Sequence, residues 1–215
     1  MNLCPEEVLT PCLPTNKRLE GSESIVGRKA MIINMEQFKG VFPALLTPFT
    51  AEGKINEKEL VKLVEMNLKK GVSGFYVGGS TAEAFLLSIE ERKYILDIVA
   101  GAVGGKATVI SHIGCIATKD ALELARHSEK AGADAISSIP PFYYNFSVPE
   151  IRDYYFDIVD KVPLPMVVYH FPAFSGVSMG MEELGAFFSD PRFIGLKFTS
   201  NDFFTLERVK NAYPD

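Results

Sequence analysis

The chain has 215 residues, of which 47% are hydrophobic, and a formal net charge of −5. This size and composition are typical of a globular protein with one large core, and the acidic balance gives no basic field for nucleic acid or an anionic membrane. Three cysteines (Cys4, Cys12 and Cys115) are too few for a disulfide framework or a metal cluster. We therefore expect a cytoplasmic protein that binds neither nucleic acid nor membrane.

Residues 1–35 differ in composition from the rest of the chain. They mix Pro, Gly, Ser and charged residues without helical or strand periodicity. Two interpretations stay open: a loose N-terminal extension, or a translated segment upstream of a start at Met31 or Met35. A targeting or docking arm is the functional alternative. We expect an irregular extension over 1–35 and a single domain over 36–215.

Apolar runs recur about every thirty residues from residue 42 onward, which matches one strand plus one helix. The runs are continuous rather than alternating, so both faces of each strand should be buried. The predicted strands contain residues 44–46, 74–77, 108–110, 135–137, 166–169 and 193–196.

The segments between these runs have helix start and stop signals. Residues 56–59 and 88–91 have capping-box spacing, and Ser147 precedes a proline that is tolerated in a first turn. Gly71 and Gly132 stand where left-handed helix ends belong.

Six strand–helix units in an α/β pattern predict a parallel β/α barrel or a doubly wound sheet. A dinucleotide-binding sheet requires G-x-G-x-x-G after its first strand, but residues 46–50 read Leu-Thr-Pro-Phe-Thr. The sequence therefore favours a TIM (β/α)8-type barrel. Because a closed barrel needs two more units than the six counted, we expect this barrel to be C-terminally incomplete, poorly active by itself and prone to association.

Lys197 interrupts the last apolar run, and Tyr169 ends the run before it. Active sites of β/α barrels lie at the carboxyl ends of the strands. Loss of solvation there lowers the pKa of an ammonium, so that the amine can attack a ketone and form a Schiff base. A phenol beside it can transfer protons. The alternatives are a lysine paired with a carboxylate or snorkelling from an edge strand, and a tyrosine used for packing.

The stretch GGSTAEAF, residues 78–85, leaves a predicted strand through two glycines. Backbone amides near a helix start attract an anion, and Ser80 and Thr81 add hydroxyl donors. A phosphate-binding loop requires a lysine after its glycines, and none follows here. The anion that fits this turn best is therefore a small carboxylate. A glycine turn with a hydroxyl helix cap is the structural alternative, and is favoured when this motif is taken alone.

Other kinds of site find little support in the sequence. The three histidines (His112, His127 and His170) lack metal-ligand spacing, and no G-x-S-x-G elbow of a serine hydrolase occurs. We expect His112 on a strand and His127 on a helix surface. The aromatic stretch PPFYY at residues 140–144 is equally consistent with an interface and with a pocket wall.

Taken together, these motifs resemble the pyruvate-dependent class I aldolase superfamily that contains N-acetylneuraminate lyase and dihydrodipicolinate synthase. The resemblance covers residues 38–215 and rests on GGSTAEAF, PPFYY, VVYHFPAFSGV and GLKFTS in that order. It implies a lyase that needs no metal or organic cofactor, because the iminium itself withdraws electrons. It also implies a homotetramer, in which Tyr143 resembles the tyrosine that one subunit lends to its neighbour's active site.

The resemblance also implies roles for individual residues. Lys197 looks like the Schiff-base lysine, and Tyr169 looks like the tyrosine that shuttles protons. Ser80 and Thr81 match the pair that holds the pyruvoyl carboxylate. Thr199 matches a pocket residue just past the lysine.

Within the family, the synthases usually have an arginine shortly after the strand-five tyrosine, and residues 171–176 (FPAFSG) lack it. The stretch PAFSGV, residues 172–177, resembles the sialic acid lyases instead. The implied reaction is retro-aldol cleavage of sialic acid to N-acetylmannosamine and pyruvate. A synthase, another pyruvate aldolase and a non-catalytic keto-acid-binding relative are the alternatives. Two residues depart from the pattern: Ala82 replaces a common glycine, and His170 replaces a common asparagine. Alanine would narrow the carboxylate turn if the backbone there needs a positive φ.

Overall fold

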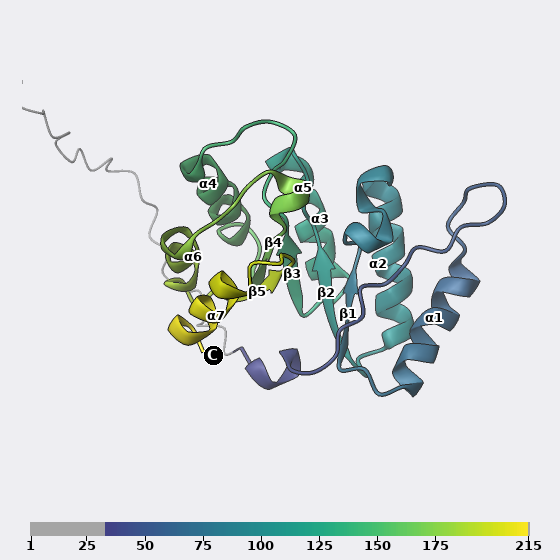
Figure 1. The fold of residues 1–215 in the computed structure, drawn as a ribbon. Coiled ribbons are helices and arrows are strands. Elements are labelled where there is room, and N and C mark those ends of the chain that lie inside the picture. Colours follow the sequence, from purple (N-terminus) through teal and green to yellow (C-terminus); the bar gives the residue numbers. More distant parts are fainter. Residues whose placement is uncertain (1–32, 215) are drawn as a thin grey trace, which may run out of the picture. The chain divides into compact units, whose positions relative to one another are not determined.

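The computed structural model describes residues 33–214, which contain a five-stranded parallel sheet in the order β1-β2-β3-β4-β5 (Figure 1). All neighbouring strands are parallel, so their carboxyl ends meet at one edge of the sheet. The strands are β1 (Gly74–Val77), β2 (Thr108–His112), β3 (Ala135–Ser138), β4 (Met166–His170) and β5 (Phe193–Phe198).

Helices alternate with the strands along the chain, which confirms the predicted α/β arrangement of a TIM-type barrel (Figure 1). The α-helices are α1 (Glu57–Lys69), α2 (Ile89–Val103), α3 (Thr118–Lys130), α4 (Val148–Val159), the short α5 (Pro172–Ser175), α6 (Met181–Phe188) and α7 (Phe203–Ala212). Three 3-10 turns complete the described elements: η1 (Met35–Phe38), η2 (Ser80–Ala82) and η3 (Ala84–Leu86).

The helix starts follow the capping signals of the sequence. Ser88 and Glu91 form the predicted capping box at the start of α2. At the start of α1, the Asn56 side chain accepts a hydrogen bond from the amide of Glu59 at 3.2 Å. Each bond satisfies an amide that has no partner inside its helix.

The first predicted strand, residues 44–46, is shorter in the structure than expected. Ala44 forms a single parallel bridge with Tyr76. The flanking hydrogen bonds run from the Leu45 amide to the Tyr76 carbonyl (3.1 Å) and from the Tyr76 amide to the Pro43 carbonyl (3.0 Å). The segment therefore lies beside β1, as predicted. Pro43 has no amide hydrogen to donate toward β1, and Gly78 leaves the strand with φ of 71°, which together limit this pairing to a bridge.

The two faces of the sheet are buried by different partners. On the inner face, a cluster joins Tyr76, Ile110, Ala135, Ile139 and Tyr169. On the outer face, two larger clusters pack strand residues against the helices. Strands β1, β2 and β3 are buried throughout, which confirms strands covered on both faces, whereas β5 is fully buried only at its first residue.

A β-bulge interrupts the pairing of β4 with β5. Met166 pairs with Phe193, but the next residue, Val167, pairs with Gly195, so Ile194 is an extra residue on β5. A bulge of this kind shifts the alternation of side chains by one position.

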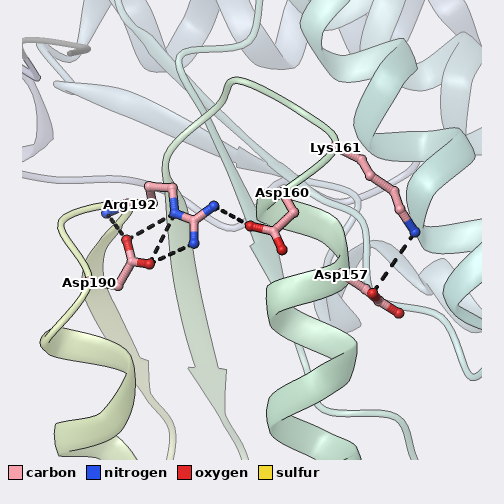
Figure 2. Close-up of polar contacts among 5 residues, drawn as sticks. All are labelled: Asp157, Asp160, Lys161, Asp190 and Arg192. Carbon is pink, nitrogen blue, oxygen red and sulfur yellow. Dashed lines mark hydrogen bonds and ion pairs between the residues drawn. The ribbon is translucent and has the colours of Figure 1, made fainter. Parts of the chain in front are cut away.

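Arg192 anchors the start of β5 (Figure 2). Its guanidinium contacts Asp160 at the end of α4 (2.5 Å) and Asp190 in the turn before β5 (2.6 Å), and its carbonyl accepts from the Met166 amide at 2.8 Å. The hydrogen bonds from the Arg192 side chain to Asp190 hold the pKa of the Asp190 carboxyl below its usual value. Figure 2 also shows the more open pair of Lys161 and Asp157, whose atoms are 3.9 Å apart.

The extension predicted for residues 1–35 lies, up to residue 32, outside the described residues. Within residues 33–214, every helix is too short or too polar to cross a bilayer.

Candidate active site

Lys197 and Tyr169 lie side by side on the inner face of the sheet. They are register partners on β5 and β4. The Lys197 Nζ is 3.4 Å from the centroid of the Tyr169 ring and 4.3 Å from the centroid of the Tyr76 ring. The two rings meet edge to face, with centroids 6.0 Å apart. The amine is therefore enclosed by two tyrosines that come from β1 and β4.

The environment of Lys197 favours its neutral form. Burial lowers the pKa of the Lys197 ammonium below its ordinary value, and the interaction with the Tyr169 side chain opposes this only in part. The groups that shift the pKa of Lys197 therefore include a phenol but no carboxylate. The geometry thus matches a nucleophilic amine better than a lysine held in an ion pair.

The GGSTAEAF turn leaves β1 at the same edge of the sheet. Gly78 adopts a left-handed conformation with φ of 71°, and the amides of Ala82 and Ala84 both donate to the Gly79 carbonyl. Within residues 33–214, no hydrogen bond uses the amides of Ser80 or Thr81. Those two amides therefore have no hydrogen-bond partner among the described residues, and their use in binding an anion stays a prediction.

The sequence predicted that a regular helix begins in this turn, but residues 80–86 do not form an α-helix. Two 3-10 turns, η2 and η3, stand there, and they are joined by Glu83 at φ of 60°. The strained residue is Glu83 and not Ala82, which is 1% exposed and does not adopt a positive φ. Alanine at position 82 therefore imposes no backbone strain on the turn.

Two buried side chains form hydrogen bonds with backbone carbonyls of the turn. The Thr47 hydroxyl donates to the Ala82 carbonyl at 2.8 Å. The His112 Nδ1 lies 2.8 Å from the Gly78 carbonyl, and since a carbonyl only accepts, Nδ1 must hold the proton. Burial, followed by the nearby Arg92 charge, lowers the pKa of His112 well below its usual value, so the ring is neutral.

Arg92 of α2 extends this support. Its guanidinium donates to the His112 carbonyl (2.9 Å) and the Gly114 carbonyl (3.0 Å). The sequence reasoning placed His112 on a strand, which is confirmed, but it missed the contribution of both side chains to the turn. The available signal was a histidine in an apolar strand with Gly114 close behind it.

The remaining predicted site residues lie in two different places. The Thr199 amide donates to the His170 carbonyl at 2.8 Å, which places Thr199 on the extension of β5, two residues after Lys197. Tyr143, in the loop after β3, is 83% exposed and has φ of 77°. In the described part of the chain its ring contacts Tyr144 (5.0 Å between centroids), and it is not brought to Lys197.

His170 departs from the family pattern, but it lies away from the amine. Its ring stacks on Phe198 with centroids 5.0 Å apart. Because successive strand residues face opposite sides, His170 lies on the outer face while Tyr169 lies on the inner one. Residues 33–214 contain no cluster of three or more His, Cys, Asp or Glu side chains that could hold a metal ion.

Known proteins resemble this chain in sequence and in structure. It is 45% identical over 179 residues to the N-acetylneuraminate lyase of Rhizobium meliloti, covering 83% of this chain and 60% of the relative. A solved structure of CdNal from Clostridium difficile, in complex with mannosamine, has 41% identity and a TM-score of 0.80 over 82% of this chain and 61% of that one.

A catalytic lysine mutant of the sialic acid aldolase of Ruminococcus gnavus has 36% identity and a TM-score of 0.81, over 84% of this chain and 59% of that one. The chain thus spans about three fifths of the length of the relatives it matches. The model of the dihydrodipicolinate synthetase family matches residues 37–215. On this match the chain belongs to the dihydrodipicolinate synthetase family.

Proposed function

We propose that the protein is an N-acetylneuraminate lyase, which cleaves sialic acid to N-acetylmannosamine and pyruvate through a Schiff base. The observation that supports this most directly is the Lys197 Nζ, 3.4 Å from the centroid of the Tyr169 ring on the inner face of a parallel sheet. The names of the similar proteins from Rhizobium meliloti and Ruminococcus gnavus favour the same substrate.

Lys197 supplies the nucleophile in this mechanism. Its neutral amine attacks C2 of open-chain sialic acid, the keto oxygen leaves as water, and a positively charged iminium remains. The amides and hydroxyls of Ser80 and Thr81 bind the neighbouring carboxylate. The iminium withdraws electrons from C3, so the carbon–carbon bond can break without a metal or an organic cofactor.

Tyr169 moves the protons in this mechanism. As the phenolate, its oxygen accepts the proton of the C4 hydroxyl while the C3–C4 bond breaks, and N-acetylmannosamine leaves as the aldehyde. The phenol formed in this way then returns the proton to C3 of the enamine on Lys197. Water hydrolyses the resulting imine, which releases pyruvate and restores the free amine.

Reductive trapping tests the Schiff base. Incubation with pyruvate and sodium borohydride should add a reduced pyruvate adduct to the peptide that contains Lys197, as read by peptide mass spectrometry. Lys197→Met should give no adduct on this peptide. A folded protein that is not trapped by pyruvate would rule out the proposed mechanism.

Substrate choice within the family needs a separate assay. The stretch at residues 171–176 lacks an arginine for a second carboxylate, which favours a sugar substrate over the aspartate semialdehyde of the synthases. We expect pyruvate release from sialic acid and no condensation of pyruvate with aspartate semialdehyde. Condensation without sialic acid cleavage would identify a synthase. Pyruvate binding without trapping would indicate a non-catalytic relative.

We also propose a homotetramer in which Tyr143 enters the active site of a neighbouring subunit. In support, Tyr143 is 83% exposed and Tyr144 beside it is 64% exposed, an unusual solvent exposure for two aromatic side chains. Sedimentation equilibrium tests the assembly. Tyr143→Ala should lower turnover if the neighbouring site uses the ring, whereas equal turnover would remove it from the site.

A cytoplasmic location in sialic acid breakdown is the setting that we propose for this activity. The buried free thiol of Cys115 supports a reducing compartment. Fractionation of the source cells, followed by immunodetection, tests this location.

A further inference from the structure

We infer that Tyr76 is a positioning residue whose aromatic face holds the positively charged nitrogen on Lys197, first as ammonium and then as iminium. This inference rests on the proposed Schiff-base function and assigns a third side chain to it. Sequence reasoning placed Tyr76 only within an apolar strand.

The position of the amine between two rings is the first observation. The Lys197 Nζ is 4.3 Å from the Tyr76 centroid and 3.4 Å from the Tyr169 centroid. Both distances are within the roughly 6 Å range of cation–π attraction, in which the negative face of the ring attracts a cation. Because the rings meet nearly at right angles, 80° apart, they cover two different sides of the nitrogen.

The Tyr76 ring is fixed in place. Its hydroxyl donates to the Ser137 Oγ at 2.9 Å, and that hydroxyl donates to the Val167 carbonyl at 2.9 Å. Tyr76 is 5% exposed, and burial raises its pKa well above the usual value. The phenol therefore stays neutral and bonded to Ser137, which leaves its ring, and not its proton, to act on Lys197.

The same ring also touches the carboxylate turn. A Cβ atom at Gly79 would lie 2.6 Å from Tyr76 Cε1, so the Gly79 backbone packs directly on the ring. Tyr76 thus contacts both the amine that bonds to C2 of a keto acid and the turn proposed to bind its carboxylate. One rigid side chain fixes the spacing between these two parts of the site.

The chemistry explains why a ring is useful here. When the iminium forms, the keto oxygen takes one proton from the amine nitrogen and a second from solvent and leaves as water, and the bond to C2 becomes a cationic C=N. Burial limits the access of water to this cation, and the described residues offer it no ion pair. The Tyr76 face stabilises the charge without adding a carboxylate that would keep Lys197 protonated.

The test compares three variants in borohydride trapping with pyruvate, measured across pH. Tyr76→Leu removes the aromatic face. Tyr76→Phe keeps the face and removes the bond to Ser137. Phe75→Leu is the matched control, because Phe75 is a fully buried aromatic residue on the same strand that packs in an outer cluster.

For Tyr76→Leu we expect the pyruvate concentration that gives half-maximal trapping to rise about tenfold, because the iminium loses its stabilising face. The pH at which the amine becomes reactive should fall by about one unit, because the ammonium loses the same face. Phe75→Leu should leave both quantities near the wild-type values. Tyr76→Phe keeps a ring beside the amine and should stay closer to the wild type than to Tyr76→Leu in both quantities.

Three results would overturn the inference: Tyr76→Leu matching the wild type in both quantities, Tyr76→Phe matching Tyr76→Leu, or Tyr76→Leu weakening trapping without changing the pH at which the amine becomes reactive. The third result would indicate a purely structural role for the ring. If pyruvate fails to trap the wild-type protein, the proposed function fails by itself. The pH dependence of Lys197 acetylation by acetic anhydride, read by mass spectrometry, then still measures the effect of Tyr76 on the amine.

Discussion

Phe193 and Lys197 lie four positions apart on β5 but face opposite sides of the sheet. Phe193 packs outward against Phe187 of α6, with ring centroids 5.1 Å apart, whereas Lys197 reaches the inner tyrosines. Strict alternation would put both on one face, because side chains two residues apart share a face. The bulge at Ile194 adds the one residue that turns Lys197 inward. The inward position of the amine is thus a consequence of the irregular pairing of β4 with β5.

Replacing Tyr169 by phenylalanine separates the two contributions of that residue. Tyr169→Phe keeps the ring 3.4 Å from the Lys197 Nζ but removes the phenol. We expect pyruvate trapping to persist while sialic acid cleavage slows by about 10²–10⁴-fold, the usual contribution of a general acid or base. Steady-state kinetics beside trapping measures both. Equal loss in the two assays would show that the phenol is needed to form the imine itself.

Adding one methyl group at Gly79 should disturb the carboxylate turn. Gly79→Ala places Cβ 2.6 Å from Tyr76 Cε1, and the buried ring has little room to yield. We expect weaker pyruvate binding in the trapping assay and a lower thermal midpoint. Gly101→Ala is the control: this exposed position of α2 has nothing within 4 Å of the added Cβ. It should raise stability by about 0.5–1 kcal/mol through helix propensity.

Much of the fold was predictable because the strands are buried on both faces. Continuous apolar runs at 74–77, 135–137 and 166–169 became β1, β3 and β4 with errors of at most one residue at either end. The segment at 44–46 was less predictable, because Pro43 beside it has no amide hydrogen to donate, and the apolar composition of the segment does not reveal this limit. The number of paired strands, five and a bridge, therefore differs from the six expected.

The candidate site could be predicted from the sequence where a polar or flexible residue interrupts an apolar strand or follows it directly. A lysine in an apolar strand and two glycines before hydroxyl residues both stand out in the sequence. Tyr76 and His112 did not, because a tyrosine or a neutral histidine fits a buried strand without further explanation. Their roles depend on which face they occupy and on contacts such as that of His112 with Gly78, which only the structure supplies.

The support beneath the turn should be costly to remove. Arg92 is 7% exposed, and Arg92→Leu leaves the buried carbonyls of His112 and Gly114 without their donor. We expect a loss of about 2–4 kcal/mol in the free energy of unfolding, measured by urea denaturation. Arg152→Leu, at a side chain that is 57% exposed, should change it by less than about 0.5 kcal/mol. Similar losses in both variants would contradict a specific role for Arg92.

The Arg192 cluster should make stability sensitive to acid. Because Arg192 holds the pKa of Asp190 below the ordinary value of 3.8, the carboxylate stabilises the fold fully above about pH 5 and progressively less as pH falls below about pH 4. Since Arg192 remains 34% exposed, solvent screening limits the effect, and Asp190→Asn should cost about 1 kcal/mol near neutral pH.

Urea denaturation at a series of pH values checks this expectation. The difference between the wild type and Asp190→Asn should be constant near neutral pH and should shrink in acid, because the protonated wild-type carboxyl has then lost the same charge. Arg192→Met should reduce this pH dependence, since Asp190 no longer has the guanidinium beside it at 2.6 Å. A difference that stays the same from neutral pH to about pH 3 would show that Asp190 acts through neutral hydrogen bonds instead of its charge.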